Sequence, residues 1–216
     1  RGEADALICG IEGRYDRHLR DVNQIIGKRE GTKTLAGLSL LISQRGAIFF
    51  TDTFVNYNPT AEEIAEITIL SAQEVRRFGI KPKAALICHS NFGSRNSESA
   101  AKMRDALAII RERAPDLEVD GEMQGGSALS EELRKRAMPS TTLSGEANLL
   151  VFPNLDAASI SLGLVRTMMD ALHVGPILLG TAKPAHVLGQ SVTSRGVVNM
   201  AALAVVEASQ PESLFG

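Results

Sequence analysis

The stretch Asn58–His89, NPTAEEIAEITILSAQEVRRFGIKPKAALICH, decides the fold, because a capped helical pattern runs directly into an apolar run of strand length. The pattern predicts a helix over Thr60–Phe78. Thr60 is a capping residue with Glu63 three positions later, which is the capping-box spacing, and apolar side chains recur along one face. Gly79 then stands where a left-handed residue ends a helix. The apolar run that closes the stretch is predicted to be a buried strand.

The same alternation of short apolar runs and longer helical patterns continues on both sides of this stretch. It is typical of β-α units and predicts an α/β fold with largely parallel sheets flanked by helices. The predicted strands are Ala6–Ile11, Leu38–Ser43, Ala47–Thr51, Ala84–His89, Glu118–Gly121, Leu149–Phe152 and Pro176–Leu179. Further helices are predicted from Ser97 to just before Pro115, over Asp156–Leu172, and from Arg195 or Gly196 to Ala208.

Composition limits the class of protein. With 216 residues, 44% of them hydrophobic and 22% charged, the chain can bury a sizeable core in one or two domains. No window reaches the roughly 18 uninterrupted apolar residues of a membrane span, and no basic-then-apolar leader is visible. We therefore expect a cytoplasmic protein without a membrane partner. A net charge of −2 without a clustered basic face argues against nucleic acid as a partner.

The sulfur and imidazole side chains do not predict a reactive or metal site. Cys9 and Cys88 lie in short apolar runs, where free cysteine packs as a small hydrophobic residue. The four histidines are scattered and none is paired with another ligand at helical or turn spacing, so we predict no metal site.

One polar loop, His89–Ser97, follows a predicted buried strand and precedes a predicted helix. Its glycine, hydroxyl groups and backbone N–H groups lie at the carboxyl end of a strand, where open α/β sheets bind ligands. A helix start of this kind favours phosphate or carboxylate. It is not a Walker loop, because the Gly-Lys-Ser/Thr ending is absent. Anion binding and an ordinary capped loop both remain open.

Two further groups of charged residues have alternative explanations. Arg14, Arg17 and Arg20 are spaced so that they share one side of a helix start, either as phosphate ligands or as a solvated face. Asp120 and Glu122 follow another strand, and such a pair either performs acid/base chemistry or caps a loop. No Gly-x-Ser-x-Gly elbow and no Gly-x-Gly-x-x-Gly fingerprint occurs. The residues alone predict an α/β protein with a cleft for an anionic ligand.

Ordered segments along essentially the whole chain resemble the phosphate acetyl/butyryltransferase family. These segments are 4–10, 19–26, 56–67, 90–94, 120–124, 147–155 and 183–184. Within that family, Ser-Asn-Phe-Gly-Ser at 90–94 and the ending at 191–204 look most like the C-terminal domain of large bacterial NADP-dependent malic enzymes. The chain begins with Arg1 rather than Met, which fits our expectation of a fragment of a longer protein.

The resemblance implies a two-lobed, phosphotransacetylase-like fold, similar to isocitrate and isopropylmalate dehydrogenases. The polar segments 27–33 and 182–194 are the predicted hinges or boundaries. Residues 1–34 and 188–216 are then expected to form parts of one lobe, and residues 35–187 the second α/β lobe.

The chain departs from the pattern of active family members at the positions that carry chemistry. Active members resemble one another in a Ser-Arg pair about five residues after Lys-Pro, and in an Asp just before Ile-Val-Asn. Here these places hold Gly189, Gln190 and Gly196. Glycine cannot accept a proton from a thiol, and Gln190 has no charge with which to hold an acyl phosphate. Ser194-Arg195 resembles the missing pair but is out of register with both anchors.

The resemblance therefore implies a binding domain rather than an enzyme. Arg20 matches an arginine that lines the substrate cleft of active members, and in malic enzymes such domains are thought to bind acetyl-CoA and tune the catalytic portion. The expected acetyl-CoA or acyl-CoA contacts are Arg20, Ser90, Asn91, Ser94, Arg95, Lys183, Ser194 and Arg195. NADP and a divalent metal are expected only in an upstream malic enzyme domain, and the whole is expected to be a homo-oligomer.

Two alternatives remain. The first is an active phosphate acetyltransferase that uses Ser194 and Arg195 to move acetyl groups between acetyl phosphate and CoA. The second is a structural dimer module, for which the apolar, alanine-rich helix Val197–Val206 is the predicted packing face.

Overall fold

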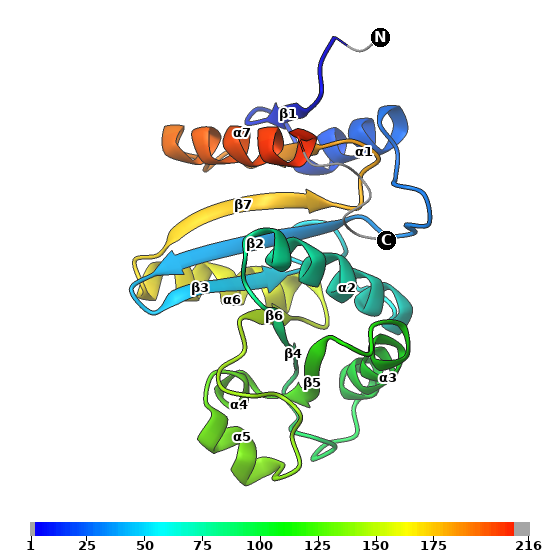
Figure 1. Cartoon of the computed structure of the whole chain (residues 1–216), viewed down its shortest axis with the longest axis vertical. Helices are drawn as coiled ribbons and strands as arrows, with labels where there is room; N and C mark the ends of the chain where they lie inside the picture. The colour runs from blue at the N-terminus through cyan, green and yellow to red at the C-terminus, as the bar shows by residue number, and fades with distance from the viewer. Residues whose placement is uncertain (1–2, 210–216) are drawn as a thin grey trace.

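The computed structural model describes residues 3–209. Its strands are β1 Leu7–Gly10, β2 Ala36–Ser43, β3 Gly46–Thr51, β4 Lys83–Ile87, β5 Glu118–Met123, β6 Leu149–Val151, β7 Leu172–Leu179 and β8 Ala185–Leu188. Its helices are α1 Tyr15–Ile25, α2 Ala61–Arg77, α3 Glu98–Arg113, α4 Gly125–Ala128, α5 Glu131–Ala137, α6 Leu155–Met168 and α7 Ser194–Ser209. Figure 1 shows two layers of unequal size. A small one contains β1, α1 and α7, and a larger one is built on the long strands β2 and β7.

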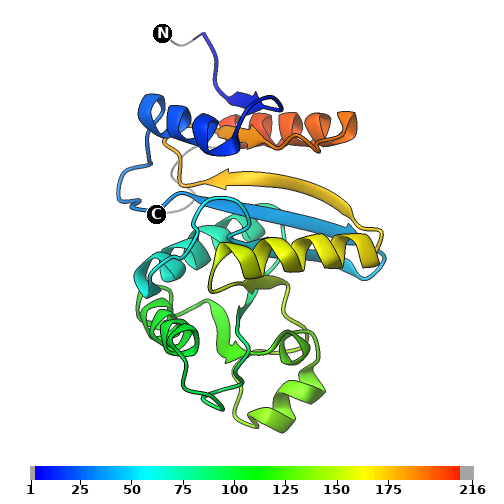
Figure 2. The same ribbon diagram turned by 180° about the vertical axis from the view of Figure 1, so that it is seen from behind.

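The larger part is a six-stranded sheet with the order β5-β4-β6-β3-β2-β7. β5, β4, β6 and β3 pair in parallel, whereas β2 is antiparallel to both of its neighbours. Ser43 pairs with Gly46, so only two residues connect β2 to β3, and such a short connection requires antiparallel strands. Helices cover both faces: α2 and α3 lie on one side, and Figure 2 shows α6 in front of the other. The predicted α/β class with mostly parallel pairing is confirmed.

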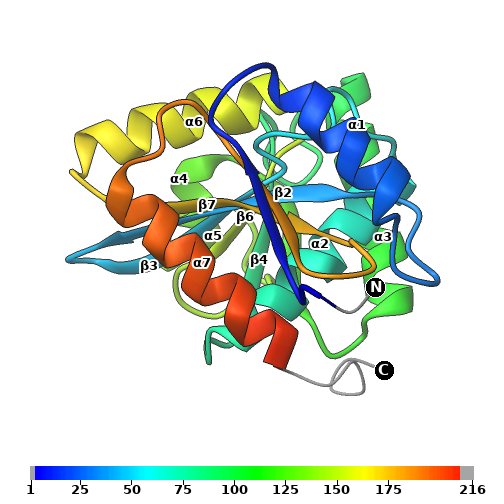
Figure 3. The same cartoon turned by 90° about the horizontal axis from the view of Figure 1, so that it is seen from above.

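The smaller sheet joins the beginning of the chain to its last strand. β1 pairs in parallel with β8 from Leu7–Ala185 to Gly10–Leu188. Gly10 has φ +105°, and a Cβ atom there would lie 2.3 Å from the Leu188 carbonyl oxygen, so this close strand approach requires glycine. Figure 3 shows α1 and α7 on the two sides of β1. Residues 3–34 and 188–209 include β1, α1 and α7 of this layer. The proposed lobe boundaries themselves stay a prediction.

The expected loop over 182–194 is wrong in part, because β8 lies inside it. All four residues of β8 are buried. The strand pairs in parallel with all four residues of β1. Four residues are too few to show a period of two, and the flanking polar residues hide the strand in the sequence.

The predicted helices are confirmed where local capping marks them. Thr60 Oγ1 accepts from Glu63 N, and Glu63 Oε2 accepts from Thr60 N, so both bonds of the capping box form. Ser97 caps α3 by accepting from Ala100 N. α6 is shorter than predicted: Asp170 adopts φ +45°, which ends the helix and allows β7 to begin at Leu172. The short helices α4 and α5 are not foreseen by any pattern described above.

The main core lies between the six-stranded sheet and helices α2 and α3. Cys88 belongs to this core, and Cys9 is half-buried in a smaller cluster beneath α1, so both free thiols pack as the sequence predicts. Within residues 3–209, no helix is long and apolar enough to cross a bilayer. The same residues contain no group of three or more His, Cys, Asp or Glu side chains with the geometry of a metal site.

Candidate functional site

A groove of about 670 Å³ lies where the segment after β8 approaches the loop after β1. Gly189, Gln190 and Gly196 all line this groove, although they come from both sides of the turn into α7. Gln190 Nε2 donates to the Gly13 carbonyl oxygen at 3.2 Å and so ties the two segments together. The opposite wall comes from the loop after β3, from α6 and from the start of β7. We call this the glycine groove.

The two glycines leave different amounts of space. A Cβ atom at Gly189 would meet nothing within 4 Å, so a side chain there would project freely. A Cβ atom at Gly196 would lie 2.8 Å from Val192 Cγ2, which is closer than such contacts occur. Val192 therefore occupies the place from which an acidic side chain at position 196 would start. A side chain at position 196 would therefore require Val192 to move.

The described residues bring one carboxylate and two imidazoles to the glycine groove, from Asp16, His18 and His173. Asp16 is the only carboxylate that lines it, and Arg14 donates to Asp16 from Nε at 3.0 Å and from Nη2 at 2.7 Å. These hydrogen bonds lower the pKa of Asp16, which makes the carboxylate a weaker base. Asp16 therefore cannot replace the missing acidic group.

The charge that remains in the glycine groove is positive. Arg14 and Arg166 both line it, and Arg166 has no ion-pair partner among residues 3–209. Burial, together with the nearby Arg166 guanidinium, lowers the pKa of His173 to about 4, so His173 is neutral at physiological pH. Burial also raises the pKa of the Tyr15 hydroxyl, which stays protonated. Two guanidinium groups against one paired carboxylate favour an anionic ligand.

The predicted arginine stripe is divided between two hollows. Arg14 precedes α1 and lines the glycine groove, whereas Arg20 lines a neighbouring hollow of about 290 Å³. Lys28, Lys33 and Asn56 face this second hollow as well, and Asp16 contributes to both. Arg20 is thus close to the glycine groove but does not line it.

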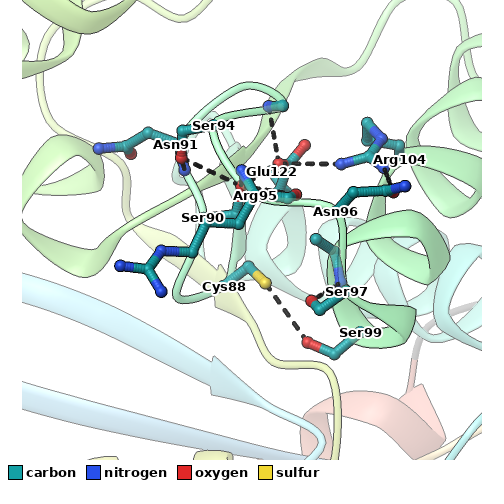
Figure 4. A network of polar contacts seen from close by, with 12 residues as sticks. Cys88, Ser90, Asn91, Ser94, Arg95, Asn96, Ser97, Ser99, Arg104 and Glu122 are labelled. Atoms are coloured by element: carbon teal, nitrogen blue, oxygen red, sulfur yellow. Dashed lines mark hydrogen bonds and ion pairs between the residues drawn. The ribbon is translucent and has the colours of Figure 1, made fainter.

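The loop 89–97 does not reach the glycine groove, and it already contacts an anion that belongs to the chain. Glu122 is fully buried, and its Oε1 accepts from Ser90 Oγ at 2.7 Å and from Gly93 N at 2.8 Å (Figure 4). Arg104 Nη1 reaches the same oxygen at 3.2 Å. The donors that we predicted for a bound phosphate or carboxylate are therefore directed at Glu122, and Ser90 itself is buried.

The remaining predicted residues of this loop also have partners within the chain. Asn91 Oδ1 accepts from Gln124 N at 2.8 Å, and Ser94 Oγ accepts from Asn91 N at 2.9 Å. The Arg95 backbone N–H donates to Ser90 Oγ at 3.1 Å, while the Arg95 side chain is exposed. This network fixes the loop above α3 and explains its composition without a ligand.

The pair Asp120 and Glu122 is structural. The carboxylate of Asp120 is nearly buried and accepts from Thr141 Oγ1 at 2.6 Å and from Thr142 N at 2.9 Å. Arg111 Nη2 lies 3.2 Å from its other oxygen. Asp120 therefore anchors the segment between α5 and β6, and of the two alternatives that the sequence left open, loop anchoring is the one that the contacts support.

Lys183 lines a third hollow, of about 980 Å³, at the N-terminal end of β1. At its base, Arg77 Nη1 lies 3.1 Å from Glu74 Oε2 and 3.9 Å from Glu207 Oε1. Glu207 Oε2 in turn lies 3.1 Å from His186 Nε2. Burial and the nearby Glu207 raise the pKa of Glu74 to about 7. The network joins α2, β8 and α7, three elements that are far apart in the sequence.

Ser194 and Arg195 lie in the first turn of α7, with exposed side chains. Neither lines the glycine groove, whereas the next residue, Gly196, does. The pair that resembles the missing Ser-Arg motif therefore does not lie where that motif is expected.

Several residues of the glycine groove are not among the predicted site residues. Tyr15, Phe54, Tyr57, Arg166 and His173 all line it, and they come from four separate segments. Tyr15 and Phe54 contact each other with ring centroids 5.3 Å apart. Only the fold brings these side chains together, so no local motif could reveal them.

Comparison with known proteins identifies the family. Residues 1–205 match the phosphate acetyl/butaryl transferase family. The chain is 74% identical over 211 residues to an NAD-dependent malic enzyme of Rhizobium meliloti, covering 98% of the chain and 27% of that protein. It is 51% identical to an NADP-dependent malic enzyme of Escherichia coli, and the match covers 98% of this chain and 28% of that protein. The chain thus spans little more than a quarter of the length of these relatives.

Stand-alone enzymes are similar as well. A phosphate acetyltransferase of Clostridium acetobutylicum is 34% identical, over 97% of the chain and 65% of that protein. Among solved structures, a phosphotransacetylase from Streptococcus pyogenes superposes with a TM-score of 0.86 at 30% identity, covering 96% of this chain and 63% of that one. With a family match that extends over nearly every residue and a shared fold, the chain belongs to the phosphate acetyl/butaryl transferase family.

Proposed function

We propose that this chain is a non-catalytic regulatory and oligomerisation domain of a bacterial malic enzyme, and that it binds acetyl-CoA or a related acyl-CoA. The observation that carries the proposal is the glycine groove. It retains two guanidinium groups for an anionic ligand, and no free carboxylate of the described residues faces it. The guanidinium groups favour the phosphates of a CoA thioester, and no carboxylate of the described residues is free there to take a proton from a CoA thiol.

The position of the groove supports a regulatory role. Its walls come from the β1–β8 layer on one side and from the six-stranded sheet and α6 on the other. A ligand in the groove therefore contacts both layers and favours the arrangement in which both sets of contacts form. A coupling of about 1–3 kcal/mol is typical of such allosteric effects. In this proposal, an upstream domain carries out the oxidative decarboxylation of malate. That domain binds NAD or NADP and a divalent metal, and the whole protein is cytoplasmic.

Calorimetry with acetyl-CoA tests this function directly. We expect measurable heat and a thermal shift with the wild-type chain, and weaker binding in Arg166→Gln, because Arg166 is the groove cation that has no ion-pair partner within residues 3–209. Arg45→Gln serves as the matched control, since Arg45 is an exposed arginine that does not line the groove. Absence of binding at millimolar acetyl-CoA would contradict the proposal.

A turnover assay separates the proposed domain from an active phosphate acetyltransferase. We expect no acetyl-CoA formation from acetyl phosphate and CoA, because no base is positioned at Gly189 or Gly196. Robust turnover that disappears in Arg195→Ala would instead support the enzyme that the sequence left as an alternative.

The oligomerisation role rests on two exposed apolar rows. Ile160, Leu164 and Met168 are spaced four residues apart on α6 and are 62%, 59% and 83% exposed. On α7, Val198 and Val205 are 66% and 64% exposed, on the helix that the sequence predicts as a packing face. Exposed apolar side chains grouped on one face of a helix are typical of protein–protein interfaces. We expect a dimer or larger assembly by light scattering, and a smaller mass in Leu164→Asp than in Thr167→Asp; equal masses would contradict this role for α6.

A further inference from the structure

Tyr57 is an aromatic side chain that the fold displays to solvent at the rim of the glycine groove. It is 75% exposed, and it is the only aromatic residue among the large exposed hydrophobic residues of the described chain. The chain has no tryptophan and only two tyrosines, so aromatic surface is scarce. An exposed ring of this kind at the edge of a groove needs an explanation beyond the core.

The backbone beneath Tyr57 is held in place rather than free to move. The neighbouring Asn56 donates from Nδ2 to the Leu35 carbonyl oxygen at 2.8 Å and to Asp52 Oδ2 at 2.5 Å. The Tyr57 carbonyl oxygen accepts from Leu155 N at 3.0 Å, at the start of α6.

The carboxylate of Asp52 fixes the rest of this loop. It is 4% exposed and also accepts from the backbone N–H groups of Phe54 and Val55, at 3.0 and 3.1 Å. Burial raises the pKa of Asp52 in spite of these bonds. A ring presented on such a rigid loop loses little conformational freedom when it binds a flat partner.

The charge next to Tyr57 belongs to Arg14. Both residues line the glycine groove, and their interaction contributes to the raised pKa of the Arg14 guanidinium, after the larger effect of Asp16. Arg14 keeps 83% of its side chain exposed while it pairs with Asp16. An exposed ion pair contributes little free energy, so a phosphate can share or replace Asp16. An aromatic face beside an exposed guanidinium fits a purine that carries a phosphate.

We infer that Tyr57 and Arg14 form the subsite for the nucleotide end of the groove ligand, with the purine stacked on Tyr57 and the ribose phosphate on Arg14. This inference rests on the proposed function, because it assigns one end of the same CoA thioester. The remainder of the groove, with Gly189 and Gly196, is left for the chain that carries the acyl group. Tyr57 and Arg14 are then determinants of specificity for the nucleotide and have no part in chemistry.

Ligands of decreasing length test the inference by calorimetry. The probes are acetyl-CoA, acetyl-dephospho-CoA, acetyl-pantetheine and adenosine 3′,5′-bisphosphate, each with wild type, Tyr57→Phe, Tyr57→Ser and Arg14→Gln. We expect Tyr57→Ser to weaken acetyl-CoA about tenfold, as the loss of one base–aromatic stack does. Acetyl-pantetheine should bind Tyr57→Ser and wild type equally well. Tyr57→Phe keeps the aromatic face and should bind acetyl-CoA like wild type.

Arg14→Gln should remove the preference for acetyl-CoA over its dephospho form, and adenosine 3′,5′-bisphosphate should bind Tyr57→Ser about tenfold more weakly than wild type. Tyr57 is exposed, so these variants are expected to keep the melting temperature of wild type. If Tyr57→Ser weakens acetyl-CoA and acetyl-pantetheine to the same extent, or weakens neither, the subsite lies elsewhere. If wild type binds none of the acyl-CoA probes, the proposed function itself fails and the subsite with it.

Discussion

Replacing Glu122 with alanine is expected to lower the free energy of unfolding by about 3 kcal/mol, which is typical when one partner of a buried ion pair is removed. The side chain is fully buried, and three donors converge on its Oε1 atom. Two of these, Ser90 Oγ and Gly93 N, would lose their acceptor in an interior where water does not replace it. The third donor, Arg104, keeps 35% of its side chain exposed and can be solvated, which limits the loss. Urea unfolding followed by circular dichroism measures the change.

Glu122→Gln is the matched control, because it keeps an acceptor oxygen and removes only the charge. We expect it to lose less than half as much stability as the alanine variant. Ser90→Ala, which removes a single hydroxyl, should cost about 1 kcal/mol. If Glu122→Ala unfolds at the same urea concentration as wild type, then the loop 89–97 is held by something other than this carboxylate, and our structural explanation of the loop is wrong.

Replacing Glu74 with glutamine is expected to stabilise the protein at pH 8 more than at pH 5. The pKa of Glu74 is raised to about 7, mainly by burial and next by Glu207, from an ordinary value of 4.5. Between these two pH values the folded state binds a proton that the unfolded state releases, so the free energy of unfolding falls as the pH rises. The linkage amounts to up to about 3 kcal/mol across this window. Glutamine does not titrate, so the variant lacks this pH dependence.

The measurement is the difference in unfolding free energy between Glu74→Gln and wild type, taken at pH 5 and at pH 8. Comparison with wild type is needed because His173 changes the free energy of unfolding in the opposite direction. Its lowered pKa removes stability as the pH falls from about 6.5 to about 4. That contribution is common to both proteins and cancels. Glu112→Gln, on the exposed side of α3, is the control. A difference that is the same at both pH values would show that Glu74 does not titrate as proposed.

Much of the larger layer can be predicted from the sequence, because its signals are local. The capping box of Thr60 and Glu63 and the cap at Ser97 place the starts of α2 and α3, since each cap needs only residues within one turn. The end of α6 is harder to predict, because Asp170 can either continue a helix or adopt the left-handed conformation. β8 is missed because its four residues, one of them the buried His186, show no period.

The candidate site is only partly predictable, for a different reason. Gly189, Gln190 and Gly196 could be found because they lie between two recognisable anchors, and the structure brings all three into one groove. Tyr57 and Arg166 could not, because their place in the groove depends on how α6 packs beside the loop after β3. The loop 89–97 has the composition of an anion site, but the partner of its donors is a residue 32 positions after Ser90. Residue type predicts the chemistry of such a loop and leaves its partner undetermined.

The parallel pairing of β1 with β8 has a consequence for biosynthesis. Leu7 hydrogen-bonds beside Ala185, 178 residues later in the chain. At a translation rate of about 5–20 residues per second, β1 emerges from the ribosome roughly 10 to 35 s before its partner strand exists. During that interval the nascent chain exposes an unpaired strand edge, the kind of surface to which chaperones bind. The six-stranded sheet lacks only β7 until shortly before β8 appears, so the layer that contains β1 and β8 is the last to be completed.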